Sequence, residues 1–590
     1  MRLYAPPIRD TLFVLDEVLD ITGHRELAPF AELDGEMLGA VVNEAARFCA
    51  DVIAPLNEVS DREGCTRHAD GSVTTPTGFP DAYRRYAEAG WGGLALSADH
   101  GGQGMPHVVA TIVEEYLNAS CQAFTMYPGL THGAVALVAA TGSDALKQAY
   151  LDDLVSGEVL GTMALTEPHC GTDLGLIRTR AEPHGDGSYA ISGEKIFCSG
   201  GEQDLTENIV HLVLARLPDA PAGSRGISLF LVPKLLPGGN RNPVSCGSIE
   251  HKMGMHGSAT CAMIFDGATG YLLGEANAGL GTMFIMMNAA RLSCGNQGLA
   301  QAERAYQNAC AYALDRRQSR GPGARADPDA TADPIIVHPD VRRMLMDARA
   351  FTEGFRALVA WTALQIDLAH HAPDSADRER ADALVGLLTP VLKAYGTDRG
   401  FETTVAMQQV LGGHGYVREW GMEQYVRDAR VAMIYEGANG VQALDLVGRK
   451  LLRDRGAAAE QFFALVQQEC ADRSGPGTEA LAKALADARG AAAWLLEHAR
   501  DDPANPGAAS YAFMQLLGVL AIGWSWACME RCAQARLHAG TDQPDFYEWK
   551  IATARYYAAH VLPQSALLRH KVETGSEALM SVPVQAFSPS

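Results

Sequence analysis

The ten residues ALTEPHCGTD, at positions 164–173, separate a helical part of the chain from a part with the pattern of β-strands. Before them, from about residue 10 to residue 158, alanine, leucine and glutamate recur at helical spacing. After them come short apolar runs bounded by glycine, proline or aspartate, which are typical of strands. We expect strands at residues 189–192, 209–215, 227–232 and 260–265. This pattern predicts a small β-barrel or β-sandwich over residues 160–281.

Helical periodicity returns at about residue 283 and predicts a helical bundle that ends near residue 455. After the turn SGPG at residues 474–477, further helical segments follow at 480–500, 511–537 and 547–568. The chain is therefore predicted to be mainly α-helical with a central β-domain. Its predicted divisions are an N-terminal extension (1–35), a helical domain (36–159), the β-domain (160–281), a helical bundle (282–455) and an additional helical domain (456–590).

The composition is that of a globular protein. Of 590 residues, 47% are hydrophobic and 20% are charged, and the formal net charge is −22. This acidic balance argues against a general nucleic-acid-binding protein, which needs a positive field. The apolar run at residues 516–524 is shorter than the roughly 20 residues of a membrane span. No signal-peptide pattern opens the chain, and its twelve cysteines form no CxxC pair. We expect a cytoplasmic protein with reduced thiols, no membrane span and no metal site.

Two segments near the predicted β-domain hold residues that could carry chemistry. In residues 164–173, Thr166 and Thr172 flank a loop shaped by proline and glycine. Their hydroxyls can face one polar ligand, but from spacing alone ordinary turn stabilisation is the favoured interpretation. In SGEKIFCSGG, residues 192–201, Phe197 and Ser199 are predicted to share one side of a strand. A planar ring could stack on Phe197 and bond to Ser199, but a core position is the simpler interpretation of the phenylalanine.

Two further segments lie in the predicted bundle. In QQVLGGHGY, residues 408–416, glycines after a helix let the backbone approach a ligand, yet they are also typical of a helix C-cap. In VRDARVAMIYEGANGVQ, residues 426–442, Glu436 ends an apolar run. Burial among the preceding apolar residues would raise the pKa of Glu436 and suit a general base. An exposed glutamate is the alternative.

Together, the four segments resemble the acyl-CoA dehydrogenase family in their order, spacing and α-β-α texture, from about residue 40 to residue 450. The patterns L-T-E-P-x-x-G-[ST]-D and R-D-x-x-x-x-x-I-Y-E-G-x-N are each fairly specific for that family. The opening YAPPIRD, residues 4–10, and the added C-terminal helices are similar to a long form of the family. The loop TEPHCGTD resembles the 3-methylmercaptopropionyl-CoA dehydrogenase branch. The resemblance implies a helical domain, a β-barrel domain and a four-helix bundle.

The resemblance also implies an activity. Members of the family are FAD-dependent enzymes that remove the α-proton and β-hydride of an acyl-CoA thioester, which gives a trans-2-enoyl-CoA. Electrons would pass to an electron-transfer flavoprotein, and FAD would lie between the subunits of a homodimer. The acyl group would be 3-methylmercaptopropionyl or a fatty acyl chain. The alternatives are an acyl-CoA oxidase, which uses O₂, and a DNA-associated flavoprotein of the same fold. Dispersed lysines and arginines in the C-terminal helices argue against the DNA-associated alternative.

Residue by residue, the resemblance assigns Glu436 as the catalytic base, while the base position of other family branches holds Ala290. Phe197 and Ser199 stand where the family usually has tryptophan and threonine, which keeps a stacking ring and a hydroxyl. The implied substrate residues are Asn288, Arg291 and Tyr435. The implied FAD contacts are Leu165, Thr166, Gly171, Thr172, Phe197, Ser199, Arg316, Gln409, Gly413, Gly437 and Asn439.

Overall fold

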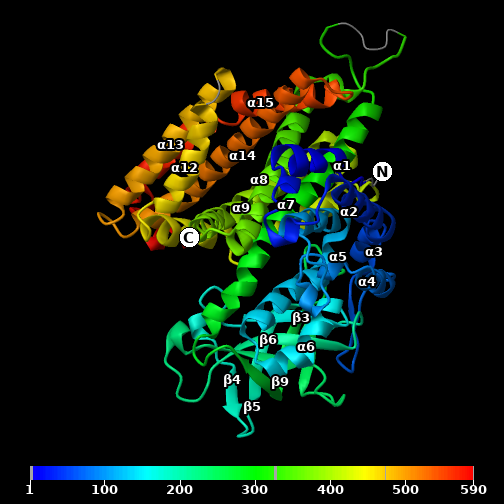
Figure 1. The fold of residues 1–590 in the computed structure, drawn as a ribbon, viewed down its shortest axis with the longest axis vertical. Coiled ribbons are helices and arrows are strands. Elements are labelled where there is room, and N and C mark those ends of the chain that lie inside the picture. Colours follow the sequence, from blue (N-terminus) through cyan, green and yellow to red (C-terminus); the bar gives the residue numbers. More distant parts are fainter. Residues whose placement is uncertain (1–3, 324–328, 472–473, 589–590) are drawn as a thin grey trace. The chain divides into compact units, whose positions relative to one another are not determined.

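The computed structural model describes residues 4–323, 329–471 and 474–588, and the chain divides into two compact units (Figure 1). The first, which we call the helical unit, comprises Met1–Ala46, Pro106–Glu115 and Cys294–Ser590. The second, the β-unit, comprises Arg47–Met105 and Tyr116–Ser293. Three helices contribute residues to both units: α2 (Gly35–Phe48), α5 (His107–Thr141) and α7 (Gly279–Asp315).

A seven-stranded sheet forms the middle of the β-unit. Its order is β3-β6-β7-β9-β5-β4, with β8 paired to β9. Strands β3 and β6 are parallel, and the other pairs are antiparallel. The four predicted strands correspond to β5, β6, β7 and β9. The sheet consists of β3 (Val159–Ala164), β4 (Arg180–Pro183), β5 (Ser188–Ser199), β6 (Asn208–Ala215), β7 (Ser228–Pro233), β8 (Val244–Ile249) and β9 (Thr260–Leu273).

Both faces of the sheet are buried, because successive strand residues enter two different apolar clusters. In β7, Leu229 and Leu231 enter one cluster, whereas Phe230 and Val232 enter the other. At the edge of the sheet, the N–H of Ala181 in β4 donates to the carbonyl of Arg216, just after β6 (2.8 Å). This contact curls the sheet into a partly closed barrel, as the pattern of the strands predicts.

Short elements complete the β-unit. Helix α6 (Asp144–Ser156) is capped by Ser143, whose hydroxyl accepts from the N–H of Leu146 (3.3 Å), and it ends before Gly157. Its buried face, which includes Tyr150 and Leu154, packs into one of the two sheet clusters. The other elements are α3 (Leu56–Glu63), α4 (Phe79–Glu88) and the two-stranded pair β1 (Thr66–Arg67) and β2 (Val73–Thr74).

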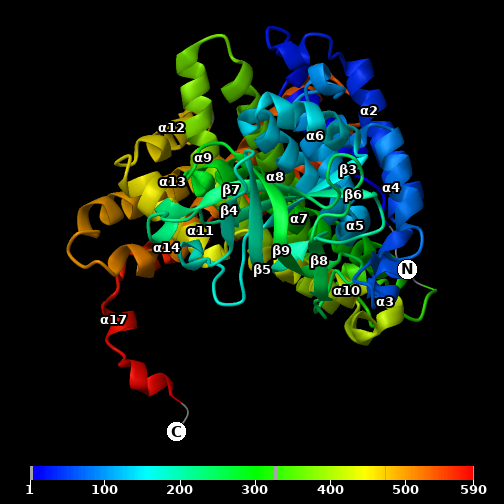
Figure 2. The same ribbon diagram turned by 90° about the horizontal axis from the view of Figure 1, so that it is seen from below.

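The helical unit is built from long helices. Helices α8 (Pro339–His371) and α9 (Ser375–Val410) form a hairpin, and Asp374 caps α9 by accepting from the N–H of Ala376 (2.8 Å). Farther along the chain, α12, α13 and α14 lie side by side (Figures 1 and 2). The remaining helices are α1 (Ile8–Leu12), α10 (Met422–Arg430), α11 (Asn439–Asp445), α12 (Ala457–Ala471), α13 (Pro476–His498), α14 (Asn505–Ala539), α15 (Pro544–His560), α16 (Gln564–Glu573) and α17 (Glu577–Met580).

Helix α14 is the core of the C-terminal helices. Within the described part of the chain, it is the helix whose length and composition would allow it to cross a membrane. However, 78% of its most apolar window is buried inside the structure, as in the core helix of a globular protein. The helix is longer than the apolar run at residues 516–524 from which the sequence analysis predicted no span.

A buried group of charged side chains joins distant parts of the helical unit. Arg356 of α8 is fully buried and pairs with Glu115 (2.6 Å), Glu303 (2.9 Å) and Asp10 of α1. Lys550 of α15 pairs with the same Asp10. Removing one member would leave a buried charge without its partner, which is costly. These contacts therefore tie α1 and α15 to the bundle.

Candidate functional site

The loop that follows β3 is joined to β5. The N–H of Ile196 donates to the carbonyl of Thr166 (2.9 Å), and the Lys195 ammonium donates to the carbonyl of Leu165 (3.0 Å). The structure thus brings the start of this loop beside the segment that carries Phe197. The predicted cofactor residues of the loop are half-buried or exposed: Leu165, Thr166, Gly171 and Thr172.

A buried ion pair holds this loop in place. The Oε1 atom of Glu167 lies 2.8 Å from Nζ of Lys195, and both side chains are almost wholly buried. The carboxylate also accepts hydrogen bonds from the hydroxyl and N–H of Thr179 and from the N–H of Arg178. Burial by itself would raise the pKa of Glu167, but the Lys195 ammonium and the other donors hold that pKa below its usual range. The carboxylate therefore remains charged inside the protein.

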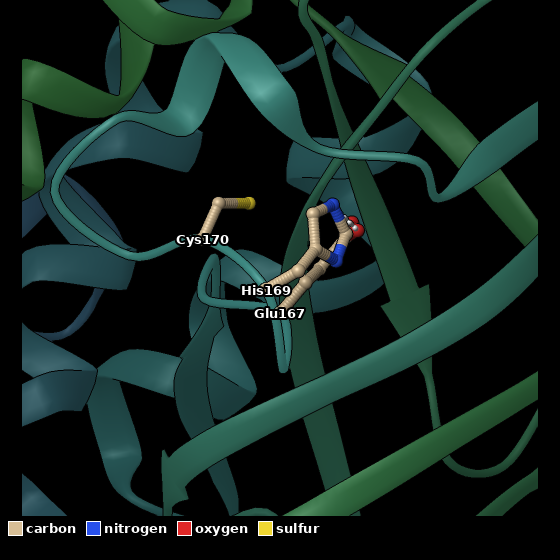
Figure 3. A group of neighbouring side chains, drawn as sticks. All are labelled: Glu167, His169 and Cys170. Carbon is tan, nitrogen blue, oxygen red and sulfur yellow. Dashed lines mark ion pairs between the residues drawn. The ribbon is translucent and has the colours of Figure 1, made fainter.

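Glu167 also belongs to a group of side chains, with His169 and Cys170, that has the composition of a metal-binding set (Figure 3). One potential ligand atom from each lies within 4.8 Å of the others. The Glu167 oxygens already serve four donors, however. Nε2 of His169 lies 2.9 Å from the carbonyl of Leu176, which requires a proton on that nitrogen. We interpret the group as part of the loop's internal bonding and not as a metal centre.

Phe197 stands out because a large aromatic side chain on a strand is 60% exposed. The pairing of β5 with β9 shifts register between Lys195 and Cys198, and Phe197 adopts a left-handed backbone with φ 58°. This bulge turns the ring outward, whereas Lys195 is buried. The regular alternation assumed for Phe197 and Ser199 is interrupted here. Ser199 is half-buried, and its carbonyl accepts from the hydroxyl of Thr162 (2.6 Å).

Two of the predicted substrate residues meet on the first part of α7, within the β-unit. Nη1 of Arg291 donates to Oδ1 of Asn288 (3.2 Å), and the guanidinium carbon lies 5.5 Å from the ring centre of Phe284. Asn288 is exposed and Arg291 is half-buried. An arginine held in this way presents a positive charge near the surface of the helix.

In the helical unit, Glu436 lies on a tight loop between the short 3-10 helix η12 (Val431–Met433) and α11. Its backbone is left-handed, with φ 53°, and the next residue, Gly437, has φ 88°. A left-handed non-glycine residue costs roughly 1–2 kcal/mol. Such a conformation persists only where neighbouring contacts impose it, and it is common at functional sites. The side chain of Glu436 is half-buried.

Hydrogen bonds on both sides of Glu436 impose this conformation. Before it, the hydroxyl of Tyr435 donates to Oε1 of Gln297 on α7. The Gln442 side chain, which is buried, donates to the carbonyl of Glu436 itself (3.2 Å). After it comes Asn439, the first residue of α11, whose side chain is buried against α9. The loop is therefore fixed by residues from two long helices as well as by its own helix.

The side chain of Asn439 makes a dense set of contacts. Its Oδ1 accepts from the buried ammonium of Lys393 (2.8 Å). Its Nδ2 donates to Oδ1 of Asp398 (2.7 Å) and to the hydroxyl of Thr397 (3.0 Å). The other oxygen of Asp398 accepts from Tyr511 of α14. Burial raises the pKa of Asp398, although these hydrogen bonds act in the opposite direction.

Three predicted FAD contacts lie on the surface of the helical unit. Arg316 follows α7, Gln409 is near the end of α9, and Gly413 is in the short 3-10 helix η10 (Gly412–Tyr416). All three are exposed in the single chain. The predicted site residues thus form one group in the β-unit and another in the helical unit.

Four family models match successive parts of the chain. They are the acyl-CoA dehydrogenase N-terminal domain (residues 36–158), the middle domain (162–268), the C-terminal domain (277–452) and an acetyl-CoA dehydrogenase C-terminal-like domain (462–583). The 3-methylmercaptopropionyl-CoA dehydrogenase of Ruegeria pomeroyi is 44% identical over 98% of this chain and 99% of its own length. The chain belongs to the acyl-CoA dehydrogenase family.

Other members of the acyl-CoA dehydrogenase family agree with this assignment. A broad-specificity linear acyl-CoA dehydrogenase of Mycobacterium tuberculosis is 34% identical over 100% of both chains. The crystal structure of an acyl-CoA dehydrogenase from Bacillus anthracis, complexed with FAD, has a TM-score of 0.73 and 20% identity and covers 93% of this chain and 89% of that one. Acyl-CoA dehydrogenases are FAD-dependent oxidoreductases. The predicted fold class, enzyme class and cofactor are therefore confirmed, while the roles of single residues and the domain boundaries stay predictions.

Several residues that shape these two loops were missed by sequence reasoning. Lys195 lies in a segment predicted as a strand but was not predicted to form an ion pair, although a lysine among apolar strand residues is a signal for a buried pair. Gln297, Asp398 and Tyr511 left no signal, because a polar residue on a long helix has the pattern of a solvated surface position. The contacts of Gln297 with Tyr435, of Asp398 with Asn439 and of Tyr511 with Asp398 depend on how the helices pack.

Proposed function

We propose that this chain oxidises an acyl-CoA thioester to its trans-2-enoyl form, with Glu436 as the general base that takes the α-proton. The observation that carries this proposal is the left-handed backbone of Glu436. It is imposed by the hydrogen bond that Gln442 donates to the Glu436 carbonyl and by the bonds that hold its neighbours, from Tyr435 to Gln297 and from Asn439 to Asp398. A strained, pre-organised acid within a family-specific sequence pattern is what a proton-abstracting group requires.

The proposed chemistry depends on where the carboxylate is held. A general base must come within hydrogen-bond reach of the carbon-bound proton. Holding the carboxylate there in advance lowers the entropic cost of reaching the transition state. The backbone N–H of Glu436 is proposed to donate to the thioester carbonyl, which stabilises negative charge as the proton leaves. A half-buried carboxylate of this kind gains basicity when bound substrate excludes water.

The residues of the β-unit fit an FAD-binding role. Phe197 is 60% exposed on a bulge beside the half-buried Leu165 and Thr166, so a flat ring would cover an apolar face bordered by polar groups. The exposed Gly171 and Thr172 offer backbone and hydroxyl donors to phosphate. When bound, FAD supplies the acceptor for the β-hydride. Arg316, Gln409 and Gly413 are proposed to reach the FAD of a partner subunit in a homodimer, and their exposure in the single chain supports this.

We further propose 3-methylmercaptopropionyl-CoA as the substrate and an electron-transfer flavoprotein as the electron acceptor, in the cytoplasm. The substrate proposal is supported by 44% identity, over nearly the whole length of both chains, to a protein named for that activity. A linear fatty acyl-CoA is the second candidate, because the 34% identical relative is named for broad specificity toward linear acyl-CoAs.

A panel of substrates tests the proposal. The purified protein is mixed anaerobically with acyl-CoAs from propionyl to palmitoyl and with 3-methylmercaptopropionyl-CoA, and the loss of flavin absorbance is followed. We expect the fastest reduction with the sulfur-containing substrate. Faster reduction by a long-chain acyl-CoA would contradict the substrate, and no reduction by any thioester would contradict the function. Turnover that is equally fast with O₂ as the only acceptor would contradict the electron-transfer flavoprotein and indicate an oxidase.

A further inference from the structure

Asp398 connects the loop of Glu436 to the C-terminal helices. Its carboxylate is buried within α9 and has hydrogen bonds on two opposite sides. Oδ1 accepts from the side chain of Asn439, the first residue of α11 (2.7 Å). Oδ2 accepts from the hydroxyl of Tyr511 and from Nε2 of Gln515 (2.7 Å), both on α14. One carboxylate therefore bridges α11 and α14.

The carboxylate of Asp398 is linked to Glu436 through only a few residues of the chain. Asn439 is three residues beyond Glu436, and the two are separated only by Gly437 and Ala438. Gly437 is left-handed, so it offers little stiffness of its own. The start of α11 can hold the orientation of Glu436 only if Asn439 is itself fixed. Its fixation comes from Lys393, Thr397 and Asp398 of α9.

Of these three, Asp398 has partners on α14. Helix α14 lies within residues 462–583, beyond the segments that carry the predicted catalytic motifs. Tyr511 is 113 residues from Asp398 along the chain, so the contact exists only when the C-terminal helices are packed in place. Hydrogen bonds to a charged, buried group are among the stronger ones.

We propose that Asp398, together with Tyr511 and Gln515, forms a positioning relay that holds the loop of Glu436 through Asn439, so that the C-terminal helices take part in proton abstraction. The inference rests on the proposed role of Glu436 as the base. Asp398 is a positioning residue, because it acts through Asn439 and not on the substrate. Loss of the relay lets the strained backbone of Glu436 relax away from its productive orientation, while the predicted FAD residues of the β-unit and the predicted substrate residues Asn288 and Arg291 are untouched.

The test uses two variants of the full-length holoenzyme. Asp398→Asn keeps the shape of the side chain but removes its charge and one acceptor. Tyr511→Phe removes a single hydroxyl from a side chain that is 44% exposed, so it is unlike a core substitution. The matched control is Tyr556→Phe, because the hydroxyl of Tyr556 on α15 also donates to an aspartate of the bundle, Asp347 (2.8 Å), far along the chain from α11. The measurements are the rate of anaerobic flavin reduction, the KM for acyl-CoA, FAD content and the thermal midpoint.

We expect the limiting rate of flavin reduction to fall about tenfold in Asp398→Asn and less in Tyr511→Phe, as for other small misplacements of a reacting group. The KM and FAD content should stay near those of the wild-type protein, and Tyr556→Phe should reduce at the wild-type rate. A merely structural role would lower the thermal midpoint and FAD content in Asp398→Asn and Tyr511→Phe without this separation of kcat from KM, and that result would overturn the proposal.

Glu436→Gln, measured alongside, separates the two proposals. If Glu436→Gln abolishes reduction while Asp398→Asn and Tyr511→Phe reduce as fast as the wild-type protein, the relay is wrong and the base assignment stands. If Glu436→Gln reduces at the wild-type rate, the base assignment fails, and the relay fails with it.

Discussion

The loop of residues 164–173 in the β-unit and the loop of Glu436 in the helical unit are fixed over very different distances along the chain. In the first, Glu167 is held by Thr179, 12 residues away, and by Lys195, 28 residues away. In the second, Tyr435 is held by Gln297, 138 residues away. The predicted cofactor loop depends on neighbouring strands, and the predicted base loop depends on distant helices.

The two regions also differ in how their buried carboxylates are compensated. Glu167 has a cationic partner, Lys195, and its pKa lies below the usual range despite burial. Asp398 accepts from the neutral groups of Asn439, Tyr511 and Gln515, and burial raises its pKa. We infer that the first loop is held by a buried ion pair together with hydrogen bonds, whereas the second is held through hydrogen bonds from neutral groups.

The largest effect is expected at the base itself. Glu436→Gln should lower the rate of flavin reduction by about 10²–10⁴-fold, because an amide cannot accept the α-proton. The protein should remain yellow and folded, since none of the predicted cofactor contacts of the β-unit is altered. The measurement is anaerobic stopped-flow reduction with the best substrate of the panel. Reduction within a few-fold of the wild-type rate would contradict the assignment, and partial recovery in Ala290→Glu with Glu436→Gly would support it.

The next largest effect is expected at the buried ion pair that holds the first loop. Lys195→Met leaves the carboxylate of Glu167 buried without its cation, which should lower the free energy of unfolding of the β-unit by about 3–5 kcal/mol. FAD content should fall as well, since Lys195 also binds the carbonyl of Leu165. Urea denaturation measures the free energy of unfolding, and flavin absorbance per chain measures the FAD content.

The control for Lys195→Met is Arg84→Met, which removes an exposed ion pair with Asp81. That change should alter the free energy of unfolding by less than about 1 kcal/mol. Equal stability of the two variants would show that the buried pair contributes nothing beyond a surface pair.

A pH experiment tests whether a buried carboxylate with neutral partners has a raised pKa, in contrast to the lowered pKa of Glu167. Asp367 of α8 accepts from the N–H groups of His107 (2.8 Å) and Val108 (3.0 Å), and burial raises its pKa to about 7. In the unfolded chain it titrates near its ordinary value of about 3.9. Between these values only the folded state holds the proton, so the free energy of unfolding falls as pH rises through this window.

Asp367→Asn should remove this contribution. The difference in unfolding free energy between the wild-type protein and the variant should therefore change between pH 4 and pH 8, by on the order of 4 kcal/mol at most. Urea midpoints at several pH values measure it, with the wild-type protein losing stability relative to the variant as pH rises. A constant difference would show that Asp367 is ionised throughout this range.

The smallest expected effect is on the turn after Glu436. Gly437→Ala places a side chain at φ 88°, where its Cβ would lie 2.5 Å from Nε2 of Gln442. The left-handed backbone should cost about 1–2 kcal/mol, and displacement of Gln442 should slow flavin reduction a few-fold. Gly440→Ala on α11, where a Cβ meets nothing within 4 Å, is the matched control and should be neutral or slightly stabilising. Equal effects of the two substitutions would argue against a special role for the turn.

The parts of the fold that sequence could predict are those with a local signal. Strands β6 and β7 are buried on both faces and so appear as apolar runs, whereas β4, with the sequence RAEP, carries no such pattern. Glu436 could be singled out because it ends an apolar run within a specific family pattern. The exposure of Phe197 could not be foreseen, since it depends on a bulge in β5. Asp398 could not be foreseen either, since its partners lie on helices whose packing no local pattern reports.

The buried cluster around Arg356 has a consequence for how the protein is made. Synthesis proceeds from the N-terminus, so Asp10 and Glu115 leave the ribosome long before Lys550, which lies 40 residues from the end of the chain. Until Lys550 arrives, the carboxylate of Asp10 would have to be buried with one of its two cations missing. Helix α1 is therefore expected to stay undocked until Lys550 has been synthesised. A chain that ends before Lys550 is therefore expected to be cut by proteases near α1 more readily than the full chain.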